Sequence, residues 1–464
     1  MNAGVAAGHP ATAAAGVEIL AEGGSAADAA VAAALASCVA ETVMTGLLGG
    51  GHAIYYDAAS AVARNLDCFC AVPGLGAAAR EPDLVRLQVP FGAELVHYAI
   101  GPASCAVPGV PAGLGALWES HGRLPWARLV EPALALARDG VPMPAAHVAC
   151  LRMLEPVMTL REGAGIYAPG GALLGEGAIL RQPGLAGALE SLADEGAHGA
   201  YDGTIGRALL DLCRERGGLV TSDDLRAYSP AWSRPVETPW LDRRFLTRAG
   251  LSRVPETLAR LPSLRGLSGS RRVVELVDRL GVETGPETHT TNLVAADADG
   301  DVCVLTTSLG LGSGDWLPGL DVHLNSMLGE ADLIHGPLEP GSRMESMMAP
   351  SLVLGGARVE LALGAAGGTR LRTALLTVAL GILDEGLAPQ DAVDRPRLHP
   401  AGALVNAEPG VDEDGLAELE SRGFRVRRWA ERHHYFGGVS AIGAAGAAAD
   451  PRRSGLALPS PAAG

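Results

Sequence analysis

The stretch ETHTTNLVAADADGDVCVLTTSLG, residues 287–310, decides the fold, because it is typical of two strands joined by a tight turn. Two alternating runs flank Ala298, Asp299 and Gly300, and a three-residue loop with glycine in the left-handed position suits this spacing. Paired residue numbers then sum to about 598, which sets Thr290 opposite Ser308 with Cβ atoms about 5 Å apart. A slip of one residue would turn Ser308 to the other face.

Thr290 and Thr291 at the start of the first strand leave two interpretations open. They are ordinary β-branched residues at a strand start, or one of them is a nucleophile. A threonine hydroxyl needs a base, and His289 would point to the opposite side of the strand. Cleavage between His289 and Thr290 would free the α-amine of Thr290, whose pKa near 8 suits proton transfer around neutral pH.

Composition limits the classes of partner. The chain has 464 residues, of which 48% are hydrophobic and 19% charged, so it can bury a large core. Its net charge of −16 argues against nucleic acid and against an anionic membrane surface as partners. The N-terminal region has no basic segment before an apolar run and no apolar run long enough to span a membrane, so we expect a cytoplasmic protein.

The cysteines predict reduced thiols, because seven scattered residues suggest no disulfide framework. Cys68 and Cys70 form a C-x-C pair, but no second Cys or His pair stands at ligand spacing, so no metal is expected. The glycines at 49–51 lack the Lys-Ser/Thr of a phosphate loop, which favours close backbone packing as their role. We expect no organic cofactor either.

The order of predicted elements indicates a layered α+β architecture. Two alanine-rich helices follow Pro10 and Ser25, a hairpin follows the glycines, and residues 112–230 are mainly helical with glycine at the helix ends. Two more helices are expected within 254–280. Strands are expected at 290–297, 302–309, 351–355 and 358–364, and a helix at about 368–385.

Six motifs, in order, resemble the γ-glutamyltransferase family of N-terminal-nucleophile hydrolases over nearly the whole chain. They are GVEILAEGGSAADAAVAAALA at 16–36, PGVPAGLGALWESHGRLPWARLVEPALALARDG at 108–140, TTNLVAADADGD at 290–301, SRMESMMAP at 342–350, GAAGGTR at 364–370 and GAAADPRRSG at 446–455. The resemblance implies a four-layer αββα sandwich. It also implies self-cleavage into a large chain, 1–289, and a small chain, 290–464, which stay together as one unit.

The same resemblance implies roles for the residues around Thr290. Thr290 would be the nucleophile and, through its new amine, the base, while Ser308 would orient it. Gly367 and Gly368 would offer backbone N–H groups to the oxyanion, which glycine suits because a bare backbone can approach the acyl carbonyl. The partners implied are a small γ-glutamyl or acyl amide and an acceptor, either water or an amino acid or peptide.

The residues that would hold a glutamyl group depart from the family's pattern. Phe69, in DCFC, stands where members that act on glutathione have an arginine for the α-carboxylate, and Phe cannot replace that contact. The family's two serines become Ser346 and Met347. Its acidic partner for the α-amine falls on Gly329, with Glu330 next to it.

These departures leave the substrate open. An asparagine late in the hairpin becomes Gly310, and Glu330, Arg343 and Arg370 could form a clamp from other directions. We therefore place Phe69, Glu330, Ser346 and Arg343 at the substrate. The alternatives to a γ-glutamyltransferase are a hydrolase of the same fold with a non-glutamyl substrate, including an acylase or a natural-product C–C hydrolase, and an unprocessed scaffold protein.

Overall fold

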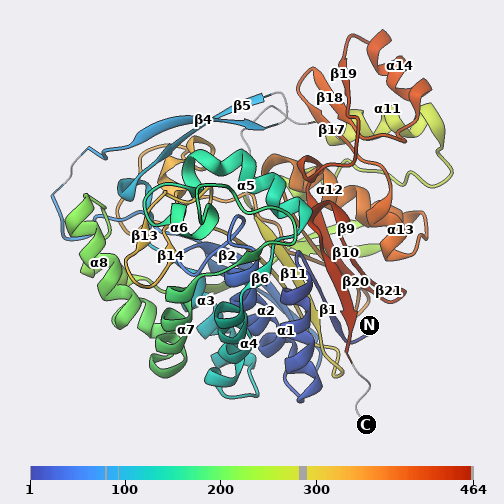
Figure 1. The fold of residues 1–464 in the computed structure, drawn as a ribbon. Coiled ribbons are helices and arrows are strands. Elements are labelled where there is room, and N and C mark those ends of the chain that lie inside the picture. Colours follow the sequence, from blue (N-terminus) through green and yellow to red (C-terminus); the bar gives the residue numbers. More distant parts are fainter. Residues whose placement is uncertain (1, 79–80, 92–93, 282–289, 461–464) are drawn as a thin grey trace.

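The computed structural model describes residues 2–78, 81–91, 94–281 and 290–460. Two antiparallel sheets face each other at the centre, and helices cover both outer faces (Figure 1). The fold is therefore a four-layer αββα sandwich of the α+β class, as predicted.

The first sheet carries the predicted hairpin at its centre. Its strands lie in the order β22 (Leu456–Pro459), β1 (Gly4–Ala7), β11 (Thr291–Ala296), β12 (Val302–Ser308), β2 (Gly50–Asp57), β3 (Val62–Cys68) and β8 (Ala231–Ser233). The predicted register is confirmed, because Thr291 pairs with Thr307 and every later pair keeps the sum of 598. Gly300 has φ +91° in the turn, the left-handed conformation that glycine tolerates best.

The second sheet packs on the first through apolar side chains. Its order is β21 (Gly446–Ala449), β20 (Gly438–Gly443), β16 (Arg358–Ala366), β15 (Ser351–Gly355), β10 (Arg243–Thr247) and β9 (Val236–Trp240). Val294 and Val304 from the first sheet meet Leu352, Ala362 and Ile442 from the second in one buried cluster. Members of this cluster stand at every second position of a strand, as Val302 and Val304 do in β12. Each strand therefore buries one face between the sheets.

Helices rich in alanine cover the outer face of the first sheet. They are α1 (Pro10–Ala21), α2 (Ala26–Ala40), α3 (Val110–His121), α4 (Trp126–Asp139), α7 (Pro183–Glu195), α8 (Thr204–Arg216) and α9 (Ser222–Ala227). Every residue of α2 is buried, so this helix needs small side chains all round. Ser25 begins it with a capping box, in which Ser25 Oγ and an Asp28 carboxylate oxygen each accept a backbone N–H.

The outer face of the second sheet is covered by a smaller group of elements. They are α10 (Val254–Leu258), α11 (Gly269–Leu280), α12 (Leu371–Ala379), α13 (Pro389–Asp394), α14 (Glu413–Ser421) and the small sheet β17 (Leu398–Ala401), β18 (Leu404–Ala407) and β19 (Arg425–Arg428). The helix predicted at 368–385 is a composite. It begins with a 3₁₀ turn, Gly368–Arg370, and ends in a π turn, Leu380–Asp384.

A further group lies to one side of the sandwich. It contains the long hairpin β4 (Val85–Phe91) and β5 (Glu94–Ile100), helices α5 (Ala145–Met158) and α6 (Gly163–Tyr167), and the short strands β6 (Val141–Pro142), β7 (Ile179–Leu180), β13 (Trp316–Leu317) and β14 (Val322–His323). Trp316 and Tyr167 are buried in its core. The hairpin β4–β5 and strand β1 were not predicted from the sequence.

Both sheets contain strands from before and from after Thr290. In the first sheet, β11 lies between β1 and β12, and β12 pairs with β2. In the second sheet, β10 pairs with β15. Residues 2–281 and 290–460, as far as the structure describes them, therefore share one hydrogen-bonded framework.

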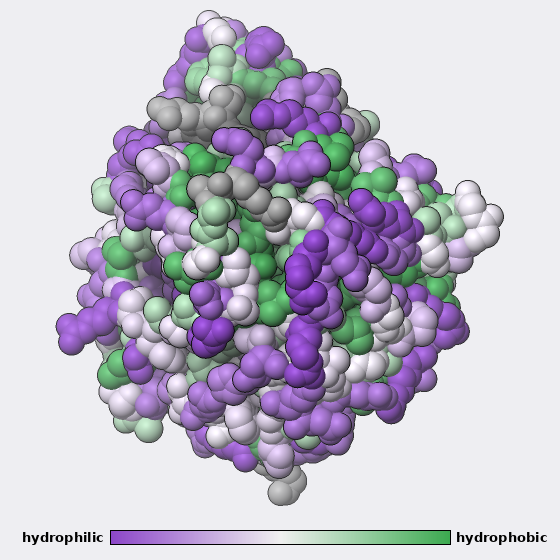
Figure 2. Space-filling view, turned by 90° about the vertical axis from the view of Figure 1, so that its left-hand side faces the viewer, coloured by the Kyte–Doolittle hydropathy of each residue, from purple (hydrophilic) through white to green (hydrophobic). Residues whose placement is uncertain are grey.

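The surface and the thiols agree with the composition. Polar and charged residues cover most of the face shown in Figure 2, and apolar residues appear between them in small groups. All seven cysteines are buried and none is in a disulfide, as predicted. Among the described residues, no helix is long and apolar enough to cross a membrane.

Candidate active site

Thr290 lies at the start of the predicted hairpin and lines two small cavities. It immediately precedes β11, is only 3% exposed, and continues the ladder in which Thr291 faces Thr307. One further step of that register sets Thr290 against Ser308, the last residue of β12. His289 lies outside the described residues, so the predicted cleavage point has no described geometry on that side.

Both the backbone and the side chain of Ser308 have partners in the fold. It pairs with Gly50 of β2, and its hydroxyl oxygen accepts a hydrogen bond from the backbone N–H of Gly310 at 2.9 Å. A Cβ at Gly49 would lie 2.3 Å from the Ser308 carbonyl oxygen, so the glycine run allows the close packing that the sequence predicted. The glycines thus position the strand that carries Ser308.

Gly367 and Gly368 form the link between β16 and α12. Their φ angles are +127° and +55°, and two successive positive values explain why both positions are glycine. A Cβ at Gly367 would lie 2.9 Å from the Cα of Gly437. Gly368 shares a cavity with Thr290, whereas Gly367 does not line it.

This cavity, which we call the Ser308-side cavity, collects most of the predicted site residues. Its lining is Phe69, Thr290, Ser308, Met327, Glu330, Leu333, Ser346, Met347, Met348, Gly368 and Leu371. The free volume is about 10 Å³, roughly the room that one water needs. Three of the lining residues are methionines, whose flexible side chains can repack around a larger group.

Phe69 supplies an apolar wall where an arginine would hold a carboxylate. Its ring stacks on His52 with centroids 5.5 Å apart, and burial lowers the pKa of His52, so this imidazole is neutral. No arginine lines the Ser308-side cavity within the described part of the chain. The cavity therefore offers no fixed positive side chain to an α-carboxylate.

Glu330 is an ionisable residue in the lining of this cavity. It is 2% exposed, and burial, followed by repulsion from Asp332, raises its pKa to about 8. Neither carboxyl oxygen has a hydrogen-bond partner among the described residues. A Cβ at Gly310 would lie 2.3 Å from Glu330 Oε1, so glycine at this position makes room for the Glu330 side chain.

Ser346 and Arg343 come from the same loop but have different surroundings. Ser346 lines the Ser308-side cavity, and its hydroxyl oxygen accepts from the N–H of Met348. Arg343 does not line the cavity. It donates to the carbonyl oxygens of Phe69 and Ser229, both at 2.7 Å, and lies over the Tyr228 ring. Its guanidinium thus supports the backbone behind Phe69, and the contact of Arg343 with substrate stays a prediction.

A second cavity, which we call the Glu41-side cavity, lies on the other side of Thr290. It is lined by Gly8, Glu41, Met44, His147, Thr290, Thr291, Asn292, Ala366, Gly438, Val439, Ser440, Asp450 and Arg453. Glu41 accepts hydrogen bonds from the hydroxyls of Thr12 and Thr291. Burial raises the pKa of Glu41 to about 7, and the two hydrogen bonds lower it in part.

The Glu41-side cavity was not predicted from the sequence, because its charged residues come from separate segments. Burial lowers the pKa of His147 to about 3, which keeps its imidazole neutral. Asp450 lies in a buried ion-pair network with Arg397 at 2.6 Å and Arg452 at 3.2 Å. The motif GAAADPRRSG contains Asp450 and Arg452, but its pattern did not indicate a network of charges.

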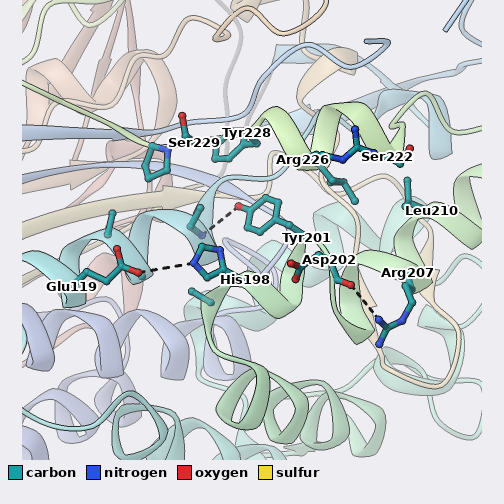
Figure 3. Close-up of a pocket in the computed structure, with 16 residues that line it drawn as sticks. Glu119, His198, Tyr201, Asp202, Arg207, Leu210, Ser222, Arg226, Tyr228 and Ser229 are labelled. Atoms are coloured by element: carbon teal, nitrogen blue, oxygen red, sulfur yellow. Dashed lines mark hydrogen bonds and ion pairs between the residues drawn. The ribbon is translucent and has the colours of Figure 1, made fainter. Parts of the chain in front are cut away.

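Another hollow lies away from Thr290, between α3, α8 and α9 (Figure 3). Its volume is about 450 Å³, and Tyr201 and Tyr228 stack at 5.6 Å on one side of it. Tyr228 donates its hydroxyl to the Phe69 carbonyl oxygen, so this wall also supports the Ser308-side cavity from behind. Across the described ranges, no group of three or more His, Cys, Asp or Glu residues could hold a metal ion.

Comparison with known proteins shows the family of the chain. The sequence model described as gamma-glutamyltranspeptidase matches residues 12–271 and 269–460. The chain is 27% identical to the acylase ACY 1 proenzyme of Pseudomonas sp. strain SE83, over 94% of this chain and 88% of the relative. It is 26% identical to glutathione hydrolase proenzyme 1 of Schizosaccharomyces pombe, over 89% and 76% of the two chains.

A solved structure gives the same fold. The cephalosporin acylase of Bacillus halodurans superposes with a TM-score of 0.81 at 23% identity, over 99% of this chain and 96% of that one. At that identity the likeness concerns the fold. Together with the family match over nearly the whole length, it shows that the chain belongs to the γ-glutamyltranspeptidase family.

Proposed function

We propose that the chain cleaves itself before Thr290 and that Thr290 then transfers the acyl group of a small amide to water or to an amine. One observation carries the proposal: Thr290 continues the register opposite Ser308 and shares a cavity with Ser308 and Gly368. A hydroxyl nucleophile, a second hydroxyl and a glycine link before a helix are what acyl transfer through threonine needs.

Self-cleavage would proceed in two steps. The Thr290 oxygen attacks the carbonyl carbon of residue 289, and the peptide nitrogen leaves as the α-amine of Thr290, which gives an ester. Water then hydrolyses that ester and releases the carboxylate of residue 289. The products are chains of residues 1–289 and 290–464, and the pairing of strands from both chains within each sheet would hold them together as a heterodimer.

The mature site would use the new amine as its base. The amine takes the proton of the Thr290 hydroxyl as the oxygen attacks the substrate carbonyl, and it returns the proton to the leaving amine. Ser308 would orient the nucleophile. The N–H groups of Gly367 and Gly368 would stabilise the oxyanion, and the positive end of the following helix adds to this effect. Water or an amine acceptor then resolves the acyl-threonine.

Two substrate classes fit the family, and the relatives include a glutathione hydrolase and an acylase. A γ-glutamyl donor would place its ammonium group against Glu330. The apolar wall at Phe69 favours the second class, an acyl group without an α-carboxylate, because no arginine is available to that carboxylate among the described lining residues. An unprocessed scaffold is the remaining alternative.

The first test is the mass of the purified protein under denaturing conditions. We expect two chains that meet at His289–Thr290. Thr290→Ala should remain a single chain without amidase activity, and Thr290→Ser should restore slow cleavage because it keeps a hydroxyl. A single wild-type chain that stays intact for days at neutral pH would overturn the proposal in favour of a scaffold protein.

The second test separates the substrate classes with three p-nitroanilides. The γ-glutamyl donor has both an amine and a carboxylate, the 4-aminobutyryl donor lacks the carboxylate, and the glutaryl donor lacks the amine. If Phe69 excludes the carboxylate, the 4-aminobutyryl donor should have the highest kcat/KM. A γ-glutamyl donor that is faster by tenfold or more would instead assign the chain to the glutathione-hydrolase type.

A further inference from the structure

A wide vestibule opens next to the Ser308-side cavity. Its volume is about 720 Å³, and its lining is Gly250, Leu251, Ser252, Arg253, Arg260, Gly281, Asp332, His335, Glu345, Met347, Gly368, Thr369, Leu371 and Arg372. Met347, Gly368 and Leu371 line both spaces. Since Thr290 and Ser308 lie in the smaller space, an acyl group held there would direct the rest of the amide past Gly368 into the vestibule.

One wall of the vestibule collects three arginines. Arg253 and Arg260 are exposed and flank α10, and Arg372 is 4% exposed in the first turn of α12. Arg372 donates to the Thr257 hydroxyl at 3.1 Å and to the Gly281 carbonyl at 3.3 Å. Its Nε has no acceptor within the described residues.

These arginines lack a matching set of carboxylates. Burial, followed by repulsion from Arg260 and Arg253, lowers the pKa of Arg372 to about 10, and attraction to Glu256 opposes this only weakly. No carboxylate of the described chain lies within 4.0 Å of any of the three guanidinium groups, whereas most other arginines of this protein form such ion pairs. Like charges gathered beside a cavity destabilise the fold unless an anion binds between them.

Two acidic residues also line the vestibule and limit where an anion can bind. They are Asp332 and Glu345, which line it with His335, and burial raises the pKa of Asp332 to about 6. A negative group in the vestibule would be attracted to the three arginines and repelled by the two carboxylates.

We propose that this vestibule binds a carboxylate on the amine half of the amide substrate, or on the acceptor that replaces it, through Arg253, Arg260 and Arg372. The inference rests on the proposed function, because it takes the acyl group to lie beside Thr290. The planar fork of arginine matches a carboxylate, and two exposed arginines backed by a buried one form a site that is open to an entering molecule.

The test compares two amides that differ in one charge, the 4-aminobutyryl amides of 4-aminobenzoate and of 4-aminobenzamide. The wild-type enzyme should prefer the benzoate by about tenfold in kcat/KM, and 0.5 M salt should reduce the preference because the exposed arginines are screened. Arg260→Gln combined with Arg253→Asn should bring the ratio close to one. Asn suits position 253, where φ is +53°.

The matched control is Arg358→Gln, an exposed arginine at the far end of β16, which should keep the full preference. Equal kcat/KM for both amides in the wild type would overturn the inference, as would a preference that survives in the double variant. An uncleaved, inactive chain would overturn the proposed function instead.

A binding measurement distinguishes a failure of the carboxylate-site inference from a failure of the proposed function. Calorimetry on the Thr290→Ala chain with 4-acetamidobenzoate and 4-acetamidobenzamide needs no turnover. Binding of the benzoate that is about tenfold tighter, and lost in the double arginine variant, would support the inference even for an inactive chain. Equal Kd values would overturn it.

Discussion

Two buried glutamates lie on opposite sides of Thr290 and differ in how they are satisfied. Glu41 is 1% exposed and Glu330 is 2% exposed, and burial raises the pKa of both, to about 7 and about 8. Glu41 accepts hydrogen bonds from two threonine hydroxyls, whereas Glu330 has no hydrogen-bond partner among the described residues.

This difference separates structure from function. A buried carboxyl that is bonded to its own fold stabilises the position of its partners, and here one partner is Thr291, the residue after the proposed nucleophile. A buried carboxyl without partners costs stability, and such groups are retained where a ligand completes them. We therefore expect Glu41 to act on the fold and Glu330 to act on the substrate.

The largest expected effect is the dependence of stability on pH. The pKa of Glu330 is raised from 4.5 in the unfolded chain to about 8 in the folded chain, so the folded state holds this proton more tightly. The stability that the folded chain gains by holding the Glu330 proton is fully present below pH 4.5, and it is lost as pH rises through 8. It amounts to roughly 3–5 kcal/mol of the free energy of unfolding.

The measurement is urea denaturation between pH 4.5 and 8.5 in the Thr290→Ala background, which keeps a single chain. The free energy of unfolding of the chain with Glu330 should fall relative to that of Glu330→Gln as pH rises. The quantity compared is how the difference between the two free energies changes with pH. If the free energies of unfolding of the two chains changed with pH in parallel, Glu330 would have an ordinary pKa. The reason for assigning Glu330 to the substrate would then be removed.

A smaller effect is expected when Glu41 is removed. Glu41→Ala leaves the hydroxyls of Thr12 and Thr291 without their acceptor and creates a cavity beside Gly8, at a cost of about 3 kcal/mol in the free energy of unfolding. Glu41→Gln keeps one acceptor oxygen and should cost about 1 kcal/mol.

The control for Glu41 is Thr45→Val, which removes a single hydrogen bond of 2.8 Å between the hydroxyls of Thr45 and Thr307, a residue of β12. It should also cost about 1 kcal/mol, since only one buried hydroxyl pair is lost. If Glu41→Ala were no more destabilising than Thr45→Val at pH 6, Glu41 would not be the glutamate of the two, Glu41 and Glu330, that acts on the fold.

The contrast between the two glutamates also shows what a sequence can predict. The hairpin register followed from local alternation and one glycine, so Thr290 and Ser308 could be paired before the structure was known. Glu330 was noticed only because it stood next to the aligned Gly329. Glu41 gave no signal, because its partners lie 29 and 250 residues away in the sequence.

The same limit explains what was missed. The carbonyl oxygens of Phe69 and Ser229, which accept hydrogen bonds from Arg343, could not be identified from the sequence. Strand β1 was missed because three of its four residues are glycine or alanine, which are depleted in strands, and it forms between the distant strands β11 and β22. Local chemistry was predictable, whereas contacts between distant segments were not.

The smallest effect, and the most specific, concerns selectivity among substrates. Glu330→Gln should lower kcat/KM for the 4-aminobutyryl donor by about 10- to 100-fold, because a hydrogen bond to a charged group contributes about 1.5–3 kcal/mol. The glutaryl donor, which has no amine, should change by less than about threefold. Glu41→Gln should affect both donors equally, since it acts through the fold.

The pH profile then distinguishes a charge contact from a change of shape. An ammonium group binds the ionised form of Glu330, so kcat/KM for the 4-aminobutyryl donor should rise as pH increases through about 8, relative to the glutaryl donor. In Glu330→Gln this ratio should be flat, because the amide does not titrate. A ratio that still rises in the variant would assign the titration to the Thr290 amine, and Glu330 would then contribute only to the shape of the cavity.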